Sequence, residues 1–457
     1  MVSKEIIESL KNIVGPENVA YDEAALTAYA YDATRIKGVP EAVVRPGSED
    51  EIAQVMRLAT KFEVPVIPRG AGSGLSGGTV AERGGIVLSF ERLNKIISID
   101  TANRIAVLQP GVVTGEFQKA VQAKGLFYPP DPGSLAFCTI GGNVAENAGG
   151  MRALKYGVTR DYVIGLRAVL PYGEVVKTGV RTAKGVVGYD LTRLLVGSEG
   201  TLAIITEITL RLVPLPEGVV TMTAFFKSPA EAGRAVAAIM ASPVTPRCLE
   251  FLDSEALAAG AKHSGMVLPE GAGGFLLVET DGSPDEAKRQ AGILKDILEK
   301  NALGVKLAAD EKEAQALWKL RRSTSQALFT LAPDKINEDT VVPVSRVPEA
   351  LEGFKAIGEK YGHKIVCFGH AGDGNIHVNV MTDKKDAARL AKAEEAVREV
   401  FRLVLELGGT ISGEHGVGIS KRQYLTMELS EGEIELLKKV KKIFDPLVIL
   451  NPGKIFP

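Results

Sequence analysis

The sequence predicts an α+β protein with about three structural units. Short apolar strands alternate with amphipathic helices in the first half of the chain, and a second strand–helix alternation follows a proline-marked break. The length of 457 residues corresponds to about three domains at roughly 150 residues each. With 45% hydrophobic and 24% charged residues, the composition is that of a globular protein with large buried cores.

The first unit is expected at residues 1–215. The segment "EDEIAQVMRLATKF" (49–62) has the apolar spacing of an amphipathic helix. The segment "GTLAIITEITLRLVPLP" (200–216) predicts two strands and a break near Pro214 to Glu217. Further short strands are predicted at "PVIP", "GGIVLSF", "KIISI" and "RIAVLQPG".

A second unit is expected at residues 216–420, and a C-terminal helix and tail at 421–457 would return to the first unit. The stretch 386–409 places Ala393, Val397 and Val400 on one helical stripe, with Leu390 and Val404, and Gly408 ends it. Strands are predicted at "VVTMTAFFKS" and "CLEFLD", and helices at "PAEAGRAVAAIMAS" and "DEAKRQAGILKDILEK".

Charge and cysteine content exclude several classes of protein. A net charge of -2 gives no electrostatic reason to bind nucleic acid, so a small-molecule ligand is expected. Cys138, Cys248 and Cys367 lie far apart, which argues against disulfides and cysteine-bound zinc. An iron–sulfur cluster normally needs four thiolates, more than this chain offers. Without a signal-like start or a membrane-length apolar run, the expected location is the cytoplasm.

The segment "PVIPRGAGSGLSGG" contains a glycine pattern typical of dinucleotide-binding Rossmann folds. Gly72, Gly74 and Gly77 match G-x-G-x-x-G, and Glu91 lies near the place of the ribose-binding acid. A crossover helix back to a parallel strand needs at least about 10–12 residues. Only about six residues separate Gly78 from "GIVLSF", which argues against a Rossmann unit.

The same glycines are better suited to binding an anion through the backbone. Consecutive small residues expose N–H groups and permit positive φ, which favours a nest for a pyrophosphate, whereas a flexible surface loop is the alternative. Two more loops of this kind occur, "DPGSLAFCTIGGNVAENAGG" (131–150) and "LLVGSEGTLAIIT". Three such loops favour one large phosphate-bearing cofactor.

These loops resemble a known family, the flavoproteins of the vanillyl-alcohol oxidase and p-cresol methylhydroxylase type. The similar segments are "IPRGAGSGLSGG", "DPGS", "TIGGNVAENAGG", "YGVTRDYV", "GSEGTLAIIT" and "NPGKIF", in the same order. The resemblance implies an FAD-binding fold of two subdomains and an α/β cap domain with an antiparallel sheet. Some relatives attach FAD through a histidine in the first glycine loop, and by this resemblance Ser73 corresponds to that histidine, so non-covalent FAD is expected.

The same resemblance implies which residues bind FAD. They are Pro68, Arg69, Gly70, Ala71, Gly72, Ser73, Gly74, Gly77 and Gly78 in the first loop, Pro132, Gly133, Ser134, Thr139, Gly142, Asn143, Asn147, Gly149 and Gly150 in the second, and Glu199, Gly200, Ile204, Ile205 and Asn451 beyond these.

The second half narrows the resemblance further. "GHAGDGNIHVNV" and "SGEHGVG" are similar to the C-terminal domain of the FAD-linked D-2-hydroxy acid dehydrogenases, a group with D-lactate and D-2-hydroxyglutarate dehydrogenases and the FAD subunit of glycolate oxidase. This implies oxidation of D-lactate, glycolate or a near relative to the 2-oxo acid. A non-catalytic flavoprotein subunit and, with less support, a flavin-free metal-dependent hydrolase are the alternatives.

Three of the five histidines lie in glycine-rich surroundings and suggest a metal site. In "NIHVNVM" strand alternation places His377 and Asn379 on one face, and "KIVCF" is the expected partner strand, so the turn "GHAGDG" brings His370 near His377. With Glu414 these form a three-ligand site with open positions. Zinc is favoured, with manganese or iron(II) as alternatives, and a hydrogen-bonded structural role is the alternative for each histidine.

Within this interpretation the substrate chelates the metal and loses its hydroxyl proton to His415, while hydride passes from C2 to flavin N5. Arg321, on a helical stripe with Trp318 and Ser325, would bind the substrate carboxylate, although a solvated helix face is the alternative. Lys335 is a second candidate cation, and Asn379 a further substrate contact.

The expected electron acceptor is a separate partner, because the chain lacks the cysteines for a cluster and a membrane segment. An electron-transfer flavoprotein, an iron–sulfur subunit or a quinone-linked protein would serve, and such a partner could bring the chain to a membrane surface. A homodimer is compatible with this interpretation.

Overall fold

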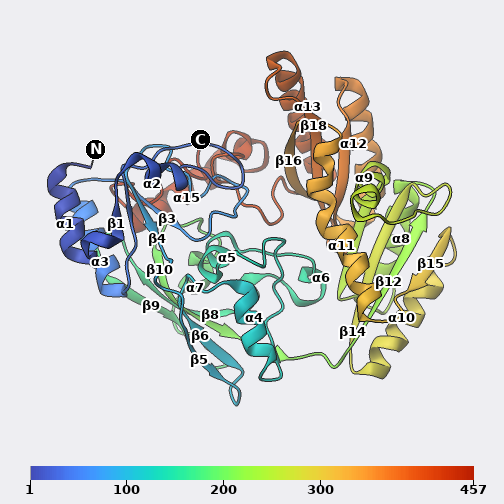
Figure 1. The fold of residues 1–457 in the computed structure, drawn as a ribbon, viewed down its shortest axis with the longest axis horizontal. Coiled ribbons are helices and arrows are strands. Elements are labelled where there is room, and N and C mark those ends of the chain that lie inside the picture. Colours follow the sequence, from blue (N-terminus) through green and yellow to red (C-terminus); the bar gives the residue numbers. More distant parts are fainter. Residues whose placement is uncertain (1) are drawn as a thin grey trace. The chain divides into compact units, whose positions relative to one another are not determined.

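The computed structural model describes residues 2–457, which form two compact units (Figure 1). Unit 1 comprises residues 2–149, 158–215 and 414–457, and unit 2 comprises 150–157 and 216–413. The chain therefore leaves unit 1 twice, once for the short excursion at residues 150–157 and once for the rest of unit 2.

The first layer of unit 1 is a four-stranded sheet in the order β1 (Val19–Ala20), β2 (Ala42–Val44), β4 (Ile86–Ser89), β3 (Val66–Arg69). Strands β2, β4 and β3 are parallel, and β1 is antiparallel to β2. Helix α3 (Glu49–Lys61) forms where the sequence predicts it, and the Ser48 side chain caps its first turn. Helix α1 (Lys4–Val14) packs beside it.

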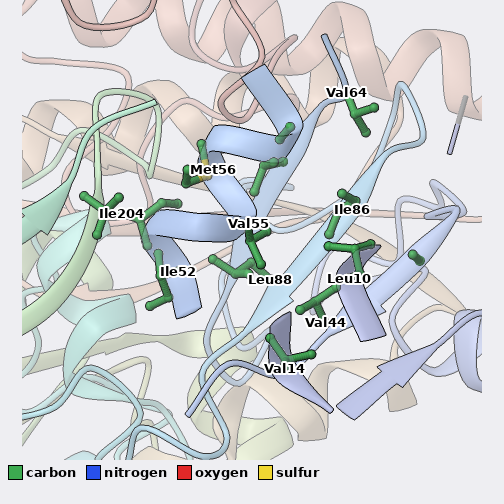
Figure 2. Close-up of a cluster of buried hydrophobic side chains, with 14 of the residues drawn as sticks. Leu10, Val14, Val44, Ile52, Val55, Met56, Val64, Ile86, Leu88 and Ile204 are labelled. Atoms are coloured by element: carbon green, nitrogen blue, oxygen red, sulfur yellow. The ribbon is translucent and has the colours of Figure 1, made fainter. Parts of the chain in front are cut away.

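Figure 2 shows the buried core of this layer. Val55 and Met56 of α3 lie among Leu10 and Val14 of α1 and the strand residues Val44, Ile86 and Leu88. Ile204, from a different sheet, joins the same cluster. Burying these side chains stabilises the layer, since a fully buried aliphatic side chain contributes about 1.5–3 kcal/mol.

The second layer of unit 1 is a five-stranded antiparallel sheet. Its order is β5 (Ile96–Asp100), β6 (Ile105–Leu108), β10 (Ile204–Arg211), β8 (Val163–Val169), β9 (Val175–Gly179), and β7 (Leu126–Phe127) pairs separately with β11 (Val213–Pro214). The helices of unit 1 besides α1 and α3 are α2 (Glu23–Ala28), α4 (Thr114–Gln122), α5 (Ile140–Glu146), α7 (Leu191–Leu195), α14 (Leu425–Glu428) and α15 (Glu431–Phe444).

The loop between β3 and β4 contains no helix, although the two strands are parallel neighbours. The short spacing after Gly78 predicts this absence, so the Rossmann interpretation is excluded at this motif. The chain instead crosses back through an irregular glycine-rich loop, residues 70–85.

Unit 2 is built on a seven-stranded antiparallel sheet. Its order is β15 (Gly304–Leu307), β12 (Gly218–Phe226), β14 (Gly274–Gly282), β13 (Cys248–Asp253), β17 (Ile365–His370), β18 (Asn375–Thr382), β16 (Asp334–Val341). The expected strands at "VVTMTAFFKS" and "CLEFLD" and the expected pair "KIVCF" and "NIHVNVM" are confirmed.

Helices pack on both faces of this sheet. Helices α9 (Ser254–Ser264) and α11 (Glu311–Ala327) pack together, and their side chains join a core with Leu252, Phe275 and Leu277. The other large helices are α8 (Pro229–Met240), α10 (Pro284–Leu298), α12 (Val347–Tyr361) and α13 (Ala387–Glu406), with short α6 (Ala153–Tyr156) in the excursion. Helix α13 ends next to Gly408, whose φ is 80°, as the sequence predicts.

Two further expectations concern the chain as a whole. Cys138, Cys248 and Cys367 are buried and free, which confirms that they form no disulfide. Among the described residues, no helix combines the length and apolar character needed to span a membrane.

Candidate functional site

The two glycine-flanked histidines of unit 2 lie side by side at the turn of a β-hairpin. Strands β17 and β18 pair with Phe368 opposite His377 and with His370 opposite Asn375. The ring centroids of His370 and His377 are 5.3 Å apart, at an angle of 83°. The turn at residues 371–374 therefore brings the two imidazoles together, as the sequence predicts.

His370 and His377 belong to a polar cluster on one face of the sheet. Because side chains alternate along a strand, Asn375, His377 and Asn379 share a face, and Asp339 of β16 lies opposite His377. Ile376, Val378 and Val380 point to the other face and are buried. One side of β18 is thus polar and the other is core.

Glu250 of β13 connects His370 to a helix. Its Oε1 lies 2.6 Å from His370 Nδ1, and its Oε2 accepts a hydrogen bond of 2.5 Å from Arg321 Nε of α11. Burial alone would raise the pKa of Glu250, but the charges of Arg321 and His370 outweigh it and hold that pKa below its usual value. Glu250 is therefore a buried carboxylate between two basic side chains.

Asp339 plays a comparable part beside His377. Its Oδ1 accepts a hydrogen bond of 2.6 Å from Asn375 Nδ2, and its Oδ2 accepts one of 2.9 Å from the N–H of Gly413. Nδ1 of His377 lies 3.7 Å from Asp339 Oδ1. Gly413 is the last residue of unit 2, so Asp339 fixes the point from which the chain continues to Glu414 and His415.

A set of four side chains could hold a metal ion. The candidate donors are Asp339 and His377 of unit 2, together with Glu414 and His415, which directly follow the last residue of that unit. Nitrogen and carboxylate oxygen donors of this kind suit zinc, manganese or iron(II). His377 and Glu414 belong to both this set and the predicted ligand set. His370 is outside the set, and Asp339 and His415, the predicted base, are additions.

The two predicted cations, Arg321 and Lys335, both lie near the aromatic ring of Phe368. The guanidinium of Arg321 lies 5.0 Å from its ring centroid and Lys335 Nζ lies 5.9 Å away. Lys335 Nζ also donates to Ser325 Oγ at 2.8 Å, so the predicted substrate residues Arg321, Ser325 and Lys335 are neighbours. Burial lowers the pKa of Lys335 to about 8.

Arg321 is nearly buried yet has unused donors. Only 5% of it is exposed, and Glu250 takes its Nε. Its terminal nitrogens Nη1 and Nη2 form no hydrogen bond with any described residue. Asn379 differs, because it is fully buried and its Nδ2 donates to the carbonyl oxygens of Val366 and His377.

In unit 1, the first glycine loop has the properties of an anion nest. The backbone N–H groups from Gly70 to Gly74 donate no hydrogen bond to any described residue. Gly72 has φ 67°, and a Cβ at Gly74 would meet nothing within 4 Å. Unused, partly exposed N–H donors beside open space suit a pyrophosphate, so this loop fits FAD.

Other predicted cofactor residues of unit 1 come together around this loop. A Cβ on Gly70 would lie 2.5 Å from Thr139 Oγ1, and one on Gly200 would lie 2.5 Å from Pro68 Cγ. Asn451 Nδ2 donates to the carbonyl oxygens of Gly78 and Glu199. The three loops that are far apart in the sequence therefore lie against one another.

Several predicted cofactor residues contact other residues of the chain, and so these groups are not available to a cofactor. The Glu199 carboxylate accepts hydrogen bonds from the N–H groups of Val417 at 2.8 Å and Gly418 at 2.7 Å, and so anchors the segment after His415. Thr139 caps α5, Asn143 Nδ2 donates to Thr114, and Ile204 belongs to the core of Figure 2. Gly150 alone falls in unit 2.

Sequence reasoning missed Glu250 and Asp339. Glu250 stands inside the apolar strand "CLEFLD", and a charged residue in a buried strand is a signal that could have found it. Asp339 lies in "NEDTVV", where four successive polar side chains precede an apolar pair and make it harder to single out.

Two known families match successive parts of the chain. Residues 40–179 match the FAD binding domain family, and residues 215–455 match the C-terminal domain of FAD linked oxidases. These two matches cover most of both units.

Three relatives align over nearly the whole chain. Glycolate oxidase subunit GlcD of Bacillus subtilis is 45% identical, with 100% of this chain and 97% of that protein covered. D-lactate dehydrogenase of Anaerostipes hadrus is 37% identical over 99% and 98%, and D-2-hydroxyglutarate dehydrogenase of Stutzerimonas stutzeri is 36% identical over 100% of both.

Among solved structures, p-cresol methylhydroxylase with substrate bound superposes with a TM-score of 0.83 over 99% of this chain and 97% of that one. The two sequences are 17% identical, so this likeness establishes the fold alone. The predicted fold of the p-cresol methylhydroxylase type is confirmed.

Proposed function

We propose that this chain, which belongs to the family of FAD-linked oxidases, oxidises a small D-2-hydroxy acid to the 2-oxo acid with FAD and a divalent metal ion. The nearly buried guanidinium of Arg321 carries this proposal, because its Nη1 and Nη2 have no partner among the described residues. A planar carboxylate is the natural complement of such a fork.

The substrate class also rests on similarity. The three relatives are called a glycolate oxidase subunit, a D-lactate dehydrogenase and a D-2-hydroxyglutarate dehydrogenase, and all three names refer to small hydroxy acids. Lys335, beside Ser325 and Phe368, adds a second cation for a carboxylate.

We assign His377 and Glu414 as metal ligands, with His370 as the third. Asp339 already accepts hydrogen bonds from Asn375 and Gly413, which suits a residue that orients His377. Zinc remains the favoured ion, with manganese and iron(II) as alternatives. Together the bound groups would supply a Lewis acid for the substrate hydroxyl and, in FAD, an acceptor for hydride.

His415 is the proposed base that takes the hydroxyl proton onto its imidazole. Its sequence neighbour Glu414 is a ligand in this scheme, and both belong to the same set of candidate donors. An ordinary imidazole has a pKa near neutrality, which suits a general base. Glu199 supports this assignment indirectly, because it anchors Val417 and Gly418 next to it.

FAD is proposed to bind non-covalently to the glycine loops of unit 1, since Ser73 offers no imidazole for a covalent link. Electrons are proposed to leave for a separate electron-transfer flavoprotein, iron–sulfur subunit or quinone-linked protein. The name of the B. subtilis relative, a subunit, supports a partner of this kind. Any association with a membrane would then be made by that partner.

The test is anaerobic mixing of the purified yellow protein with a panel of D- and L-2-hydroxy acids, while the flavin absorbance is followed. We expect bleaching by one D-acid or by glycolate, and release of the flavin into the supernatant after acid precipitation. A flavin that no 2-hydroxy acid reduces would favour a non-catalytic flavoprotein subunit, and a colourless protein would favour a flavin-free hydrolase.

A further inference from the structure

Glu250 is a buried carboxylate whose two oxygens serve two different basic groups. Only 1% of Glu250 is exposed. Oε1 lies 2.6 Å from Nδ1 of His370, and Oε2 lies 2.5 Å from Nε of Arg321. One side chain therefore contacts both the proposed metal ligand and the proposed carboxylate-binding cation.

The antiparallel sheet explains the first contact. Strands β13 and β17 pair with Phe251 opposite Gly369 and Leu252 opposite Phe368, so Glu250 and His370 are neighbours across the two strands. Side chains in such positions share a face and lie close together. Helix α11 packs over the same face and supplies Arg321 from above the strand.

The contact with His370 decides which nitrogen of its ring carries the proton. An ionised carboxylate can only accept hydrogen bonds, so Nδ1 must be the donor. In a neutral imidazole the lone pair then stands on Nε2, the nitrogen that could bind a metal ion. A buried carboxylate behind a histidine is a common means of orienting a metal ligand.

The contact with Arg321 acts on the other end of the site. Glu250 engages Nε, on one edge of the guanidinium, and the ring of Phe368 lies 5.0 Å from its central carbon. These two contacts fix the orientation of the guanidinium plane. The N–H groups of Nη1 and Nη2 remain available to a ligand. A fixed guanidinium loses less entropy when it binds a carboxylate than a mobile one.

We infer that Glu250 is a positioning residue that holds Arg321 and His370 together, and so orients the carboxylate-binding and metal-binding sides of one substrate site. This inference rests on the proposed function. A purely structural ion pair is the competing explanation, since buried pairs also occur without any functional role.

The chain offers a matched control in Glu279, another buried carboxylate on the same face of the sheet. It pairs with Cys248 across β13 and β14, and it accepts hydrogen bonds from Trp318 Nε1 at 2.6 Å and Thr221 Oγ1 at 3.0 Å. Glu279 contacts no histidine among the described residues, so Glu279→Gln tests the general cost of neutralising a buried carboxylate.

The first measurement is the tautomer of His370 in holoenzyme labelled with ¹⁵N-histidine, without substrate. The chain has only five histidines, so the spectrum is simple, and His370→Asn assigns the signal. We expect Nδ1–H in the wild type and in Glu250→Asp, and a changed tautomer or exchange-broadened signal in Glu250→Gln. Glu279→Gln should leave the His370 signal unchanged.

The second measurement is the affinity for zinc by chelator competition, together with KM and kcat. We expect Glu250→Gln to lose about 10- to 100-fold in zinc affinity and to raise KM more than it lowers kcat. Glu250→Asp, which keeps the charge, should recover part of both losses. If Glu250→Gln does not fold, the inference is still tested by the zinc affinity of Glu250→Asp and by the tautomer of His370 in the wild type.

Two outcomes would overturn the inference. One is a wild-type His370 protonated at Nε2, and the other is equal loss of zinc affinity in Glu250→Gln and Glu279→Gln. If the proposed function is wrong, the result is different, because no 2-hydroxy acid will then reduce the flavin of the protein. The His370 tautomer is measured without substrate, so it tests Glu250 in either case.

Discussion

Asp339 of β16 lies directly opposite His377 of β18, with Oδ1 of the aspartate 3.7 Å from Nδ1 of the histidine. His370 has a similar carboxylate neighbour in Glu250. Each predicted histidine ligand is therefore accompanied by a buried carboxylate from an adjacent strand. This arrangement favours a functional role for the two histidines as metal ligands, because a carboxylate neighbour commonly orients a histidine ligand.

His377→Ala is expected to remove the metal ion and the activity while the flavin spectrum stays intact, because His377 belongs to unit 2 and the glycine loops to unit 1. Metal analysis of the purified protein should fall from about one divalent ion per chain to background. His263→Ala, at an exposed position, is the control and should change neither value. Full activity of a rigorously metal-free wild type would end the metal hypothesis.

Arg321→Met is expected to raise KM by about 10- to 150-fold, since a hydrogen bond to a charged group contributes about 1.5–3 kcal/mol. Arg322→Met is the matched control, because Arg322 is the exposed neighbour on the same helix and stacks on Trp318. Steady-state kinetics with an artificial electron acceptor would measure both. Equal KM values for the two variants would contradict a role of Arg321 in carboxylate binding.

Substrate binding is expected to weaken above pH 8. Burial lowers the pKa of Lys335 to about 8, so its amino group is charged below that pH and neutral above it. A neutral Lys335 attracts a carboxylate less, and KM should therefore rise between about pH 7 and 9. Lys335→Arg keeps its charge throughout this range and should flatten the profile.

His415→Ala should keep bound FAD and metal but slow flavin reduction by about 10²- to 10⁴-fold, the usual effect of removing a positioned general base. The wild-type rate should also fall at acid pH, where the imidazole is protonated. Anaerobic stopped-flow reduction at saturating substrate measures this step. A mutant rate within about threefold of the wild type would remove His415 from the mechanism.

Gly200→Ala is expected to destabilise unit 1 by about 1–3 kcal/mol and to weaken FAD binding. Gly200 has φ 64°, and a Cβ there would lie 2.5 Å from Pro68 Cγ. Gly432→Ala in α15 is the control, because nothing lies within 4 Å of its Cβ and alanine favours a helix. Thermal unfolding of the two variants should shift in opposite directions.

The sequence by itself determined the elements and much of the chemistry they carry. Alternation in "NIHVNVM" correctly placed His377 and Asn379 on one face of β18, and the short spacing after Gly78 correctly excluded a crossover helix. These predictions succeed because they depend on neighbours within a few residues, where backbone geometry sets the period. The glycine loops were also identified locally, through the backbone freedom of glycine.

Only the tertiary structure decided which distant side chains meet. Glu250 reaches His370 across 120 positions of sequence, and Glu199 reaches Gly418 across 219. No local pattern encodes such pairs, because the sheet order that joins β13 to β17 results from packing of the whole unit. The same holds for Arg321 of helix α11, whose expected partner was the substrate but whose Nε donates to the buried carboxylate of Glu250 on strand β13.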